Sequence, residues 1–199
     1  NNKAERIYSN SHIEEFLMEY IAICEEYLDI DDMDERICII TERSEARFAT
    51  SSNGEIKKNE DGVPCIKDGV HIMFPEIHTH YSLQMKFREL ILKKCNEIFG
   101  DLNLSNSYSD VIDKSIIKGT GWMMFGSTKP NATPYEITRV LTVFPDNVEP
   151  REDFDLTKIS SKNLVALLSI RNKDEEESTI LENKVDEVEK MKLDSEKKS

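Results

Sequence analysis

The spacing of apolar residues predicts two amphipathic helices in the first half of the chain. Residues 11–27 carry apolar side chains at helical intervals, with Ser11 placed to cap the first turn and Glu14 three residues later. Residues 79–99 carry a second apolar stripe of the same period, interrupted by Lys94. Each stripe can bury one face of a helix against a core.

Strands are indicated where apolar residues run continuously or alternate with polar ones. Residues 36–42 (RICIITE) are typical of a buried strand, and residues 51–64 of a polar loop. In residues 66–77 (IKDGVHIMFPEI) alternate side chains point to opposite faces, so one face joins the core and the other carries His71.

The second half of the chain adds a hairpin-like unit and ends in a charged segment. Residues 121–130 and 135–144 are predicted as two strands joined by a polar loop that contains proline. Residues 164–172 are expected to close the globular part as a strand or helix–strand edge. Residues 174–199 hold ten acids and five lysines, which predicts an acidic linker or disordered tail that does not pack, following a domain at 1–173.

The formal net charge of -13 argues against a protein that grips nucleic acid with its whole surface. The 174–199 segment supplies -5 of this charge and the remaining 173 residues supply -8. Any basic groove must therefore be a local feature.

The compartment is predicted from what the chain lacks. No stretch approaches the roughly 18 uninterrupted apolar residues of a membrane span, and the start, NNKAERIYSN, has no apolar run like that of a secretory signal. The four cysteines form no C-x-x-C pair, so they are expected to be reduced thiols. A cytoplasmic or nuclear protein that is not secreted and does not contact a membrane is expected.

Two single features could carry chemistry, and each has a plainer explanation. Asp29 and Asp31 are two apart and could share a divalent metal, but they sit in an acid-rich stretch after a helix, where a solvated turn is the favoured explanation. His71 on its strand could bind a ligand, although a lone histidine on a strand is usually structural.

A third candidate combines an acid with a polar turn. Asp113 follows two apolar residues, and Ser127 and Lys129 lie in a Gly-Ser-Thr-Lys turn whose hydroxyl and ammonium groups could hold a triphosphate. The turn is not a P-loop, because the chain contains no G-x-x-x-x-G-K-[ST] pattern.

Order and spacing make these pieces more specific together. The string KDGVHIMFPEI, followed about 40 residues later by VIDKSIIKGTGWMMFGSTKPNATPYEIT and then LLSIRN, resembles the archaeo-eukaryotic primase domain of the primase–helicases of nucleocytoplasmic large DNA viruses, the poxvirus, asfarvirus and mimivirus type. The similarity runs from about Glu5 to Asn172. It implies an α+β fold with a mixed or mainly antiparallel sheet flanked by helices.

The resemblance also implies an activity, namely DNA primase or primase-polymerase nucleotidyl transfer directed by a template. By that resemblance His71 is catalytic and contacts the phosphates of the incoming nucleotide, Asp113 is a catalytic metal ligand, and Ser127 and Lys129 bind the nucleotide. Mg²⁺ or Mn²⁺ is the implied cofactor. Nucleoside triphosphates, a single-stranded DNA template and a helicase module C-terminal to this domain are the implied partners, in an infected host cell.

One part of the family pattern has no match here. The family's first motif, a D-x-D pair that supplies two metal ligands, should precede the segment that resembles ERIYSNSHIEEF, and only NNKA does so. The chain is therefore expected to be N-terminally incomplete and inactive alone as a polymerase, because two catalytic ions need several acidic ligands. A non-catalytic α+β interaction module is the alternative, and a metal-dependent nuclease comes third.

Overall fold

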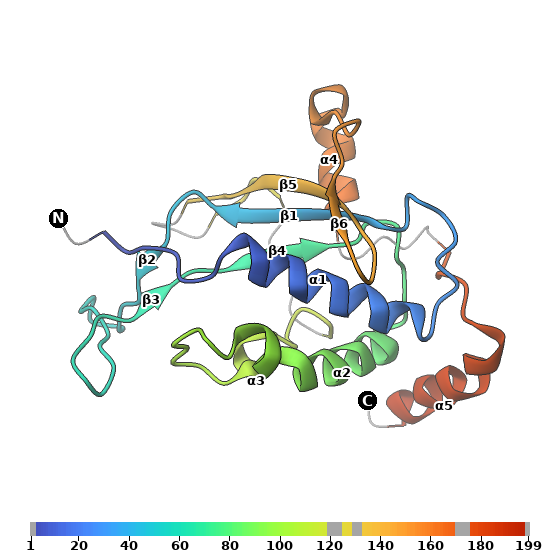
Figure 1. Cartoon of the computed structure of the whole chain (residues 1–199), viewed down its shortest axis with the longest axis horizontal. Helices are drawn as coiled ribbons and strands as arrows, with labels where there is room; N and C mark the ends of the chain where they lie inside the picture. The colour runs from blue at the N-terminus through green and yellow to red at the C-terminus, as the bar shows by residue number, and fades with distance from the viewer. Residues whose placement is uncertain (1–2, 119–124, 129–132, 170–175, 198–199) are drawn as a thin grey trace.

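The computed structural model describes residues 3–118, 125–128, 133–169 and 176–197, and it has an α+β fold. An antiparallel sheet of four strands, in the order β4-β1-β5-β6, is covered on one face by α1 and α2, while α4 rises from the other side (Figure 1). The predicted fold class, an antiparallel sheet flanked by helices, is confirmed. The elements are α1 (Asn10–Glu25), β1 (Ile37–Arg43), β2 (Arg47–Phe48), β3 (Ile66–Lys67), β4 (Val70–Met73), α2 (Tyr81–Phe99), α3 (Tyr108–Val111), β5 (Tyr135–Val143), β6 (Val148–Pro150), η1 (Leu156–Lys158), α4 (Ser161–Leu167), η2 (Glu182–Lys184) and α5 (Val185–Glu196).

The main core lies between the sheet and the two long helices. Leu17 and Ile21 of α1 and Phe87 and Ile91 of α2 are almost fully buried, as is Ile40 of β1. Burying each such side chain contributes about 1.5–3 kcal/mol. This is why the stripes in residues 11–27 and 79–99 form helices that pack together.

A smaller cluster covers part of the opposite face of the sheet. Ile37 and Ile39 of β1 are buried there with Leu168, which follows α4, and Met73 of β4 packs against them. Because β1 is buried on both faces, its sequence is a continuous apolar run. The two faces of the sheet are therefore distinct, and β4 contributes side chains to both.

Two predictions about helices differ in detail from the structure. Helix α1 begins after Ser9 rather than Ser11, and His12 rather than Glu14 accepts the hydrogen bond of the Ser9 N–H at 3.0 Å. Residues 164–172 were predicted as a strand or a helix–strand edge, and of these the described residues 164–167 belong to helix α4 (Ser161–Leu167) rather than to a strand. Short apolar runs do not distinguish a buried strand from a helix.

The polar loops also contain more structure than their composition predicts. Within residues 51–64 the chain folds back twice, with isolated bridges Thr50↔Ile56 and Lys58↔Pro64 that extend the β2–β3 ribbon. The strand predicted at 121–130 lies largely outside the described residues, and at Gly126 the chain turns with φ of +81°.

The prediction that the acidic C-terminal segment does not pack is wrong for residues 176–197. Ile180 bridges to Leu28, and α5 lies against α2 with Val188 only 1% exposed in the main core (Figure 1). The acids lie on the outer side of the helix, while a few apolar positions face inward. Net charge therefore concealed an amphipathic helix.

Cys24, Cys38 and Cys95 are buried free thiols and Cys65 is half-buried. Within the described ranges, no helix is long and apolar enough to cross a membrane.

Candidate nucleotide-binding site

His71 lies on β4, an outer strand of the four-stranded sheet. It is the direct cross-strand partner of Thr41 on β1. Val70 and Ile72 on either side pack into the main core under the helices, so alternation directs His71 to the opposite face with Met73. The prediction that His71 lies on the face of its strand opposite to Val70 and Ile72 is confirmed.

A tyrosine from a different strand fixes the ring of His71. Tyr135 begins β5, and its ring stacks on His71 with centroids 3.8 Å apart and an interplanar angle of 16°. Because β1 lies between β4 and β5, the Tyr135 side chain reaches across β1 to make this contact. The guanidinium of Arg43, the cross-strand partner of Tyr135, lies 4.9 Å from the centre of the same ring.

These surroundings keep the imidazole neutral. Burial lowers the pKa of His71 to about 4, and the positive charge of Arg43 acts in the same direction. At neutral pH the ring therefore carries one N–H donor and no charge. A positive charge that binds phosphate on this face of the sheet therefore has to come from another side chain near His71.

Asp113 lies on the helix side of the fold. Its carboxylate accepts hydrogen bonds from the Ser115 N–H and hydroxyl, both at 2.8 Å, and these bonds lower its pKa. The preceding Ile112 packs against the main core and its carbonyl accepts a 2.7 Å hydrogen bond from Arg88 of α2. The contacts described here for Asp113 and for His71 involve different residues, and the convergence of these two side chains stays a prediction.

The Gly-Ser-Thr-Lys turn is described in part. Ser127 is exposed, two residues after Phe125, which packs on the same sheet face as Met73. Lys129 lies outside the described residues. Ser127 therefore follows a residue anchored on the His71 face, whereas the predicted role of Lys129 stays a prediction.

Sequence reasoning did not identify a buried carboxylate on β1. Glu42 is 5% exposed and points to the helix side, away from His71. Its oxygens accept hydrogen bonds from Arg6 at 2.9 Å, from the Tyr8 hydroxyl at 2.9 Å and from the Thr138 hydroxyl. Burial alone would raise the pKa of Glu42, but the hydrogen bonds and the charges of Arg6 and Arg139 outweigh it and lower the pKa.

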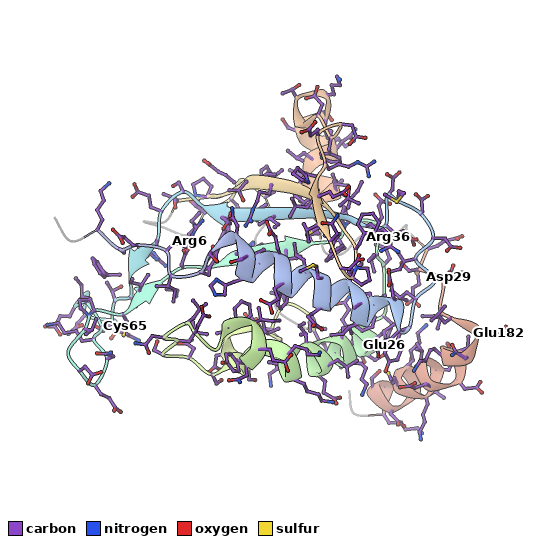
Figure 2. The ribbon with its side chains drawn as sticks, in the orientation of Figure 1. Arg6, Glu26, Asp29, Arg36, Cys65 and Glu182 are labelled. Carbon is purple, nitrogen blue, oxygen red and sulfur yellow. The ribbon has the colours of Figure 1, made fainter. Side chains whose placement is uncertain are left out.

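This carboxylate joins three segments that are distant in the sequence. The register between β1 and β5 shifts at Ile40/Thr41, a bulge that lets both Thr138 and Arg139 approach Glu42. Arg6, labelled in Figure 2 beside the end of the sheet, also donates to Asp68 at 2.7 Å and to the Arg43 carbonyl at 2.8 Å. The N-terminal segment therefore fixes the turn that leads into β4 and His71. The alternation of residues along a strand predicts on which face of the sheet a side chain lies. Nothing in the local sequence predicts the distant partners of Glu42.

The described residues do not by themselves fit a divalent metal. No group of three or more His, Cys, Asp or Glu side chains within them could hold a metal ion. The β1 positions nearest His71 on its own face are Thr41 and Arg43, neither of which is a carboxylate. The Asp29 and Asp31 pair lies elsewhere, in an acidic surface depression beyond α1, where the Asp29 N–H donates to the Thr179 carbonyl (Figure 2).

Two comparisons with known proteins found sequences similar to this chain. The model of the C962R protein N-terminal archaeo-eukaryotic primase domain matches residues 1–141. A protein of Acanthamoeba polyphaga mimivirus described as putative helicase L207/L206 is 32% identical over 137 residues, which are 67% of this chain and 13% of that protein. No solved structure matches.

The matched region includes α1, β1, β4, α2 and most of β5. It therefore contains both His71, which lies on β4, and Tyr135, which begins β5. The similarity thus extends over the elements that build the candidate site. The chain belongs to the C962R-type family of N-terminal archaeo-eukaryotic primase domains.

Proposed function

We propose that this chain provides the nucleotide-binding part of a DNA primase domain in a viral replicative primase–helicase. The observation that supports this most directly is His71 in its G-V-H sequence, half-buried and fixed by Tyr135 on the sheet face opposite α1 and α2. A fixed neutral imidazole can donate one hydrogen bond to a phosphate oxygen. The chemistry of the complete protein would be template-directed nucleotidyl transfer.

The other proposed roles rest on the family resemblance. Ser127 and Lys129 would add donors for the triphosphate, and Asp113 would be a metal ligand. For Asp113 this role depends on the predicted convergence with His71, because its described contacts are hydrogen bonds from Ser115 and the nearby charge of Arg88. Mg²⁺ or Mn²⁺ is proposed as the cofactor on the same ground.

The proposed partners follow from the relatives rather than from this site. Nucleoside triphosphates and a single-stranded DNA template are the substrates of a primase. The chain spans about 13% of the mimivirus relative, which is described as a putative helicase. We therefore propose a helicase module in the same polypeptide, acting at the viral replication site of the infected cell.

The experiment separates nucleotide binding from polymerisation. The chain is titrated with ATP and with a deoxynucleoside triphosphate in a calorimeter, and primer synthesis on single-stranded DNA is assayed with Mg²⁺ and with Mn²⁺. We expect weak nucleotide binding and no primer synthesis. His71→Ala should abolish the binding, whereas Asp31→Ala, a change in the acidic depression, should leave it intact.

Two outcomes would contradict the proposal in different ways. Absence of nucleotide binding by the wild-type chain would favour the non-catalytic interaction module. Robust primer synthesis would show that carboxylates within residues 1–199 complete the metal site. In that case Asp113→Asn should remove the activity.

A further inference from the structure

His71 is neutral at physiological pH, so a triphosphate at this site needs a positive charge from another side chain. Arg43 is two residues beyond Thr41 on β1, and Thr41 is the cross-strand partner of His71. The two-residue period of a strand puts Arg43 on the same face as His71. Its charge already acts on the imidazole, where it lowers the pKa of His71.

Tyr135 contacts both of these groups. One contact is the stack with His71 at 3.8 Å, and another is the guanidinium of Arg43 at 4.9 Å from the ring centre. The hydroxyl end reaches Gly69, where an added Cβ would come within 3.1 Å of the Tyr135 oxygen. Gly69 of the G-V-H sequence thus leaves room for Tyr135. The Tyr135 ring in turn sets the positions of the His71 and Arg43 side chains that it contacts.

We propose that Arg43 is the phosphate-binding cation of this site and that Tyr135 is a positioning residue that holds Arg43 and His71 as one anion-binding pair. Both Arg43 and His71 are half-buried, so part of each residue is exposed on this face. A guanidinium gives planar, charge-assisted hydrogen bonds to phosphate, and its stacking on an aromatic ring orients it beforehand. The proposal rests on the proposed nucleotide binding and names the residues that would confer it.

The variants separate charge from position. Arg43→Gln removes the charge, and Arg43→Lys keeps the charge without the planar stack. Tyr135→Leu removes the ring, and Tyr135→Phe keeps it. Arg47→Gln, at an exposed arginine on β2, is the matched control for loss of one positive charge.

Binding of ATP in EDTA is measured by calorimetry, because the predicted contacts need no metal. We expect Arg43→Gln to weaken binding by about 10-fold or more, the usual scale for a charge-assisted hydrogen bond. Arg43→Lys and Tyr135→Leu should fall between this value and the wild type. Tyr135→Phe and Arg47→Gln should bind as the wild type does. Inorganic tripolyphosphate should show the same order if the phosphates are what Arg43 recognises.

A second measurement does not depend on nucleotide. The pKa of the His71 imidazole, followed by NMR, should rise in Arg43→Gln and in Tyr135→Leu and stay unchanged in Tyr135→Phe and Arg47→Gln. This shift reports that Arg43 and Tyr135 lie close to the imidazole, whereas the binding measurement reports recognition of phosphate. Circular dichroism verifies that each variant is folded.

The failures are distinguishable. If the wild-type chain binds no ATP, the proposed function falls and this inference falls with it. If the wild type binds and Arg43→Gln binds equally well, only the inference is overturned. If Tyr135→Leu changes neither binding nor the pKa of His71, the positioning role of Tyr135 is overturned.

Discussion

His71 and Glu42 lie on adjacent strands but on opposite faces of the sheet, and their surroundings lower both pKa values for different reasons. Around His71, burial and the nearby Arg43 disfavour the charged imidazolium. Around Glu42, hydrogen bonds and two arginines favour the charged carboxylate strongly enough to overcome burial. Acidification is therefore unfavourable to the folded state at both positions.

For His71 we expect an NMR titration with a midpoint near pH 4, in chelator-treated protein. The unfolded chain takes up this proton near pH 6.5, before the folded chain does. The stability linked to His71 is thus fully present above about pH 6.5 and is lost as pH falls toward 4. A midpoint at the ordinary histidine value would show that the ring is neither buried nor close to a cation.

For Glu42 we expect Glu42→Ala to lower the free energy of unfolding by about 3 kcal/mol, because it leaves Arg6, Tyr8 and Thr138 without their shared acceptor. The control is Glu45→Ala, whose carboxylate pairs with Lys3 at 3.9 Å on the exposed surface. That change should cost less than about 1 kcal/mol. Urea unfolding at pH 7 provides the comparison.

The pH dependence of the same variant gives an independent check. Because the pKa of Glu42 is lowered by folding, its contribution is present above about pH 4.3 and is lost as pH falls through its folded value. The gap between wild type and Glu42→Ala should therefore shrink in acid. A gap that stays constant down to pH 3 would contradict the assignment of the buried ion pairs.

At the scale of elements, α5 shows how a charged helix can belong to the core. Half of its side chains are exposed acids and lysines, but Val188 is 1% exposed and Met191 packs against the main cluster. The segment before it is held by backbone hydrogen bonds from Asp29 to Thr179 and from Leu181 to Tyr27, both 2.9 Å. A few inward positions and a short bridge are enough to dock the helix.

For α5 we expect Val188→Asp to detach the helix, since a carboxylate there would be buried without a partner at a cost of several kcal/mol. Val185→Asp is the matched control, because Val185 is 43% exposed on the same helix. Limited proteolysis should cleave Val188→Asp rapidly within 176–197 and leave both the wild type and Val185→Asp protected. Equal cleavage of all three would mean that α5 does not pack in solution.

The sequence predicted the elements whose periodicity is long and regular. The two long helices, β1 and the orientation of His71 follow from apolar spacing over many residues. Helix α4 was not predictable in this way, since its short apolar run fits either structure. Tyr135 and Arg43 were missed because stacking across an intervening strand depends on sheet order, which local pattern does not encode.

At the scale of the whole molecule, the excess of acids limits what the surface can bind. The net charge of -13 is distributed over both α5 and the rest of the chain. At the proposed phosphate site, positive charge comes only from side chains close to the site. Binding to the backbone of a nucleic acid needs several phosphate contacts at once. A short triphosphate is thus a better match to this surface than a long polyanion.

We therefore expect single-stranded DNA to bind this chain with a Kd no tighter than about 10⁻⁵ M at physiological salt, within the range of non-specific association. Fluorescence anisotropy with a labelled oligonucleotide measures this directly. Nanomolar binding would show that the chain has a basic surface in addition to the positive side chains of the proposed phosphate site.

The three buried thiols offer a way to watch this domain open. Cys24, Cys38 and Cys95 lie in α1, β1 and α2, and burial raises the pKa of each. A thiol-specific reagent reacts with the thiolate, so it should modify half-buried Cys65 first and reach the other three only when their element separates from the core. Mass spectrometry measures the labelling rate of each cysteine, and the three slow rates would rank how readily α1, β1 and α2 open locally in the wild-type protein. Cys65, beside the β2–β3 ribbon, serves as the internal reference.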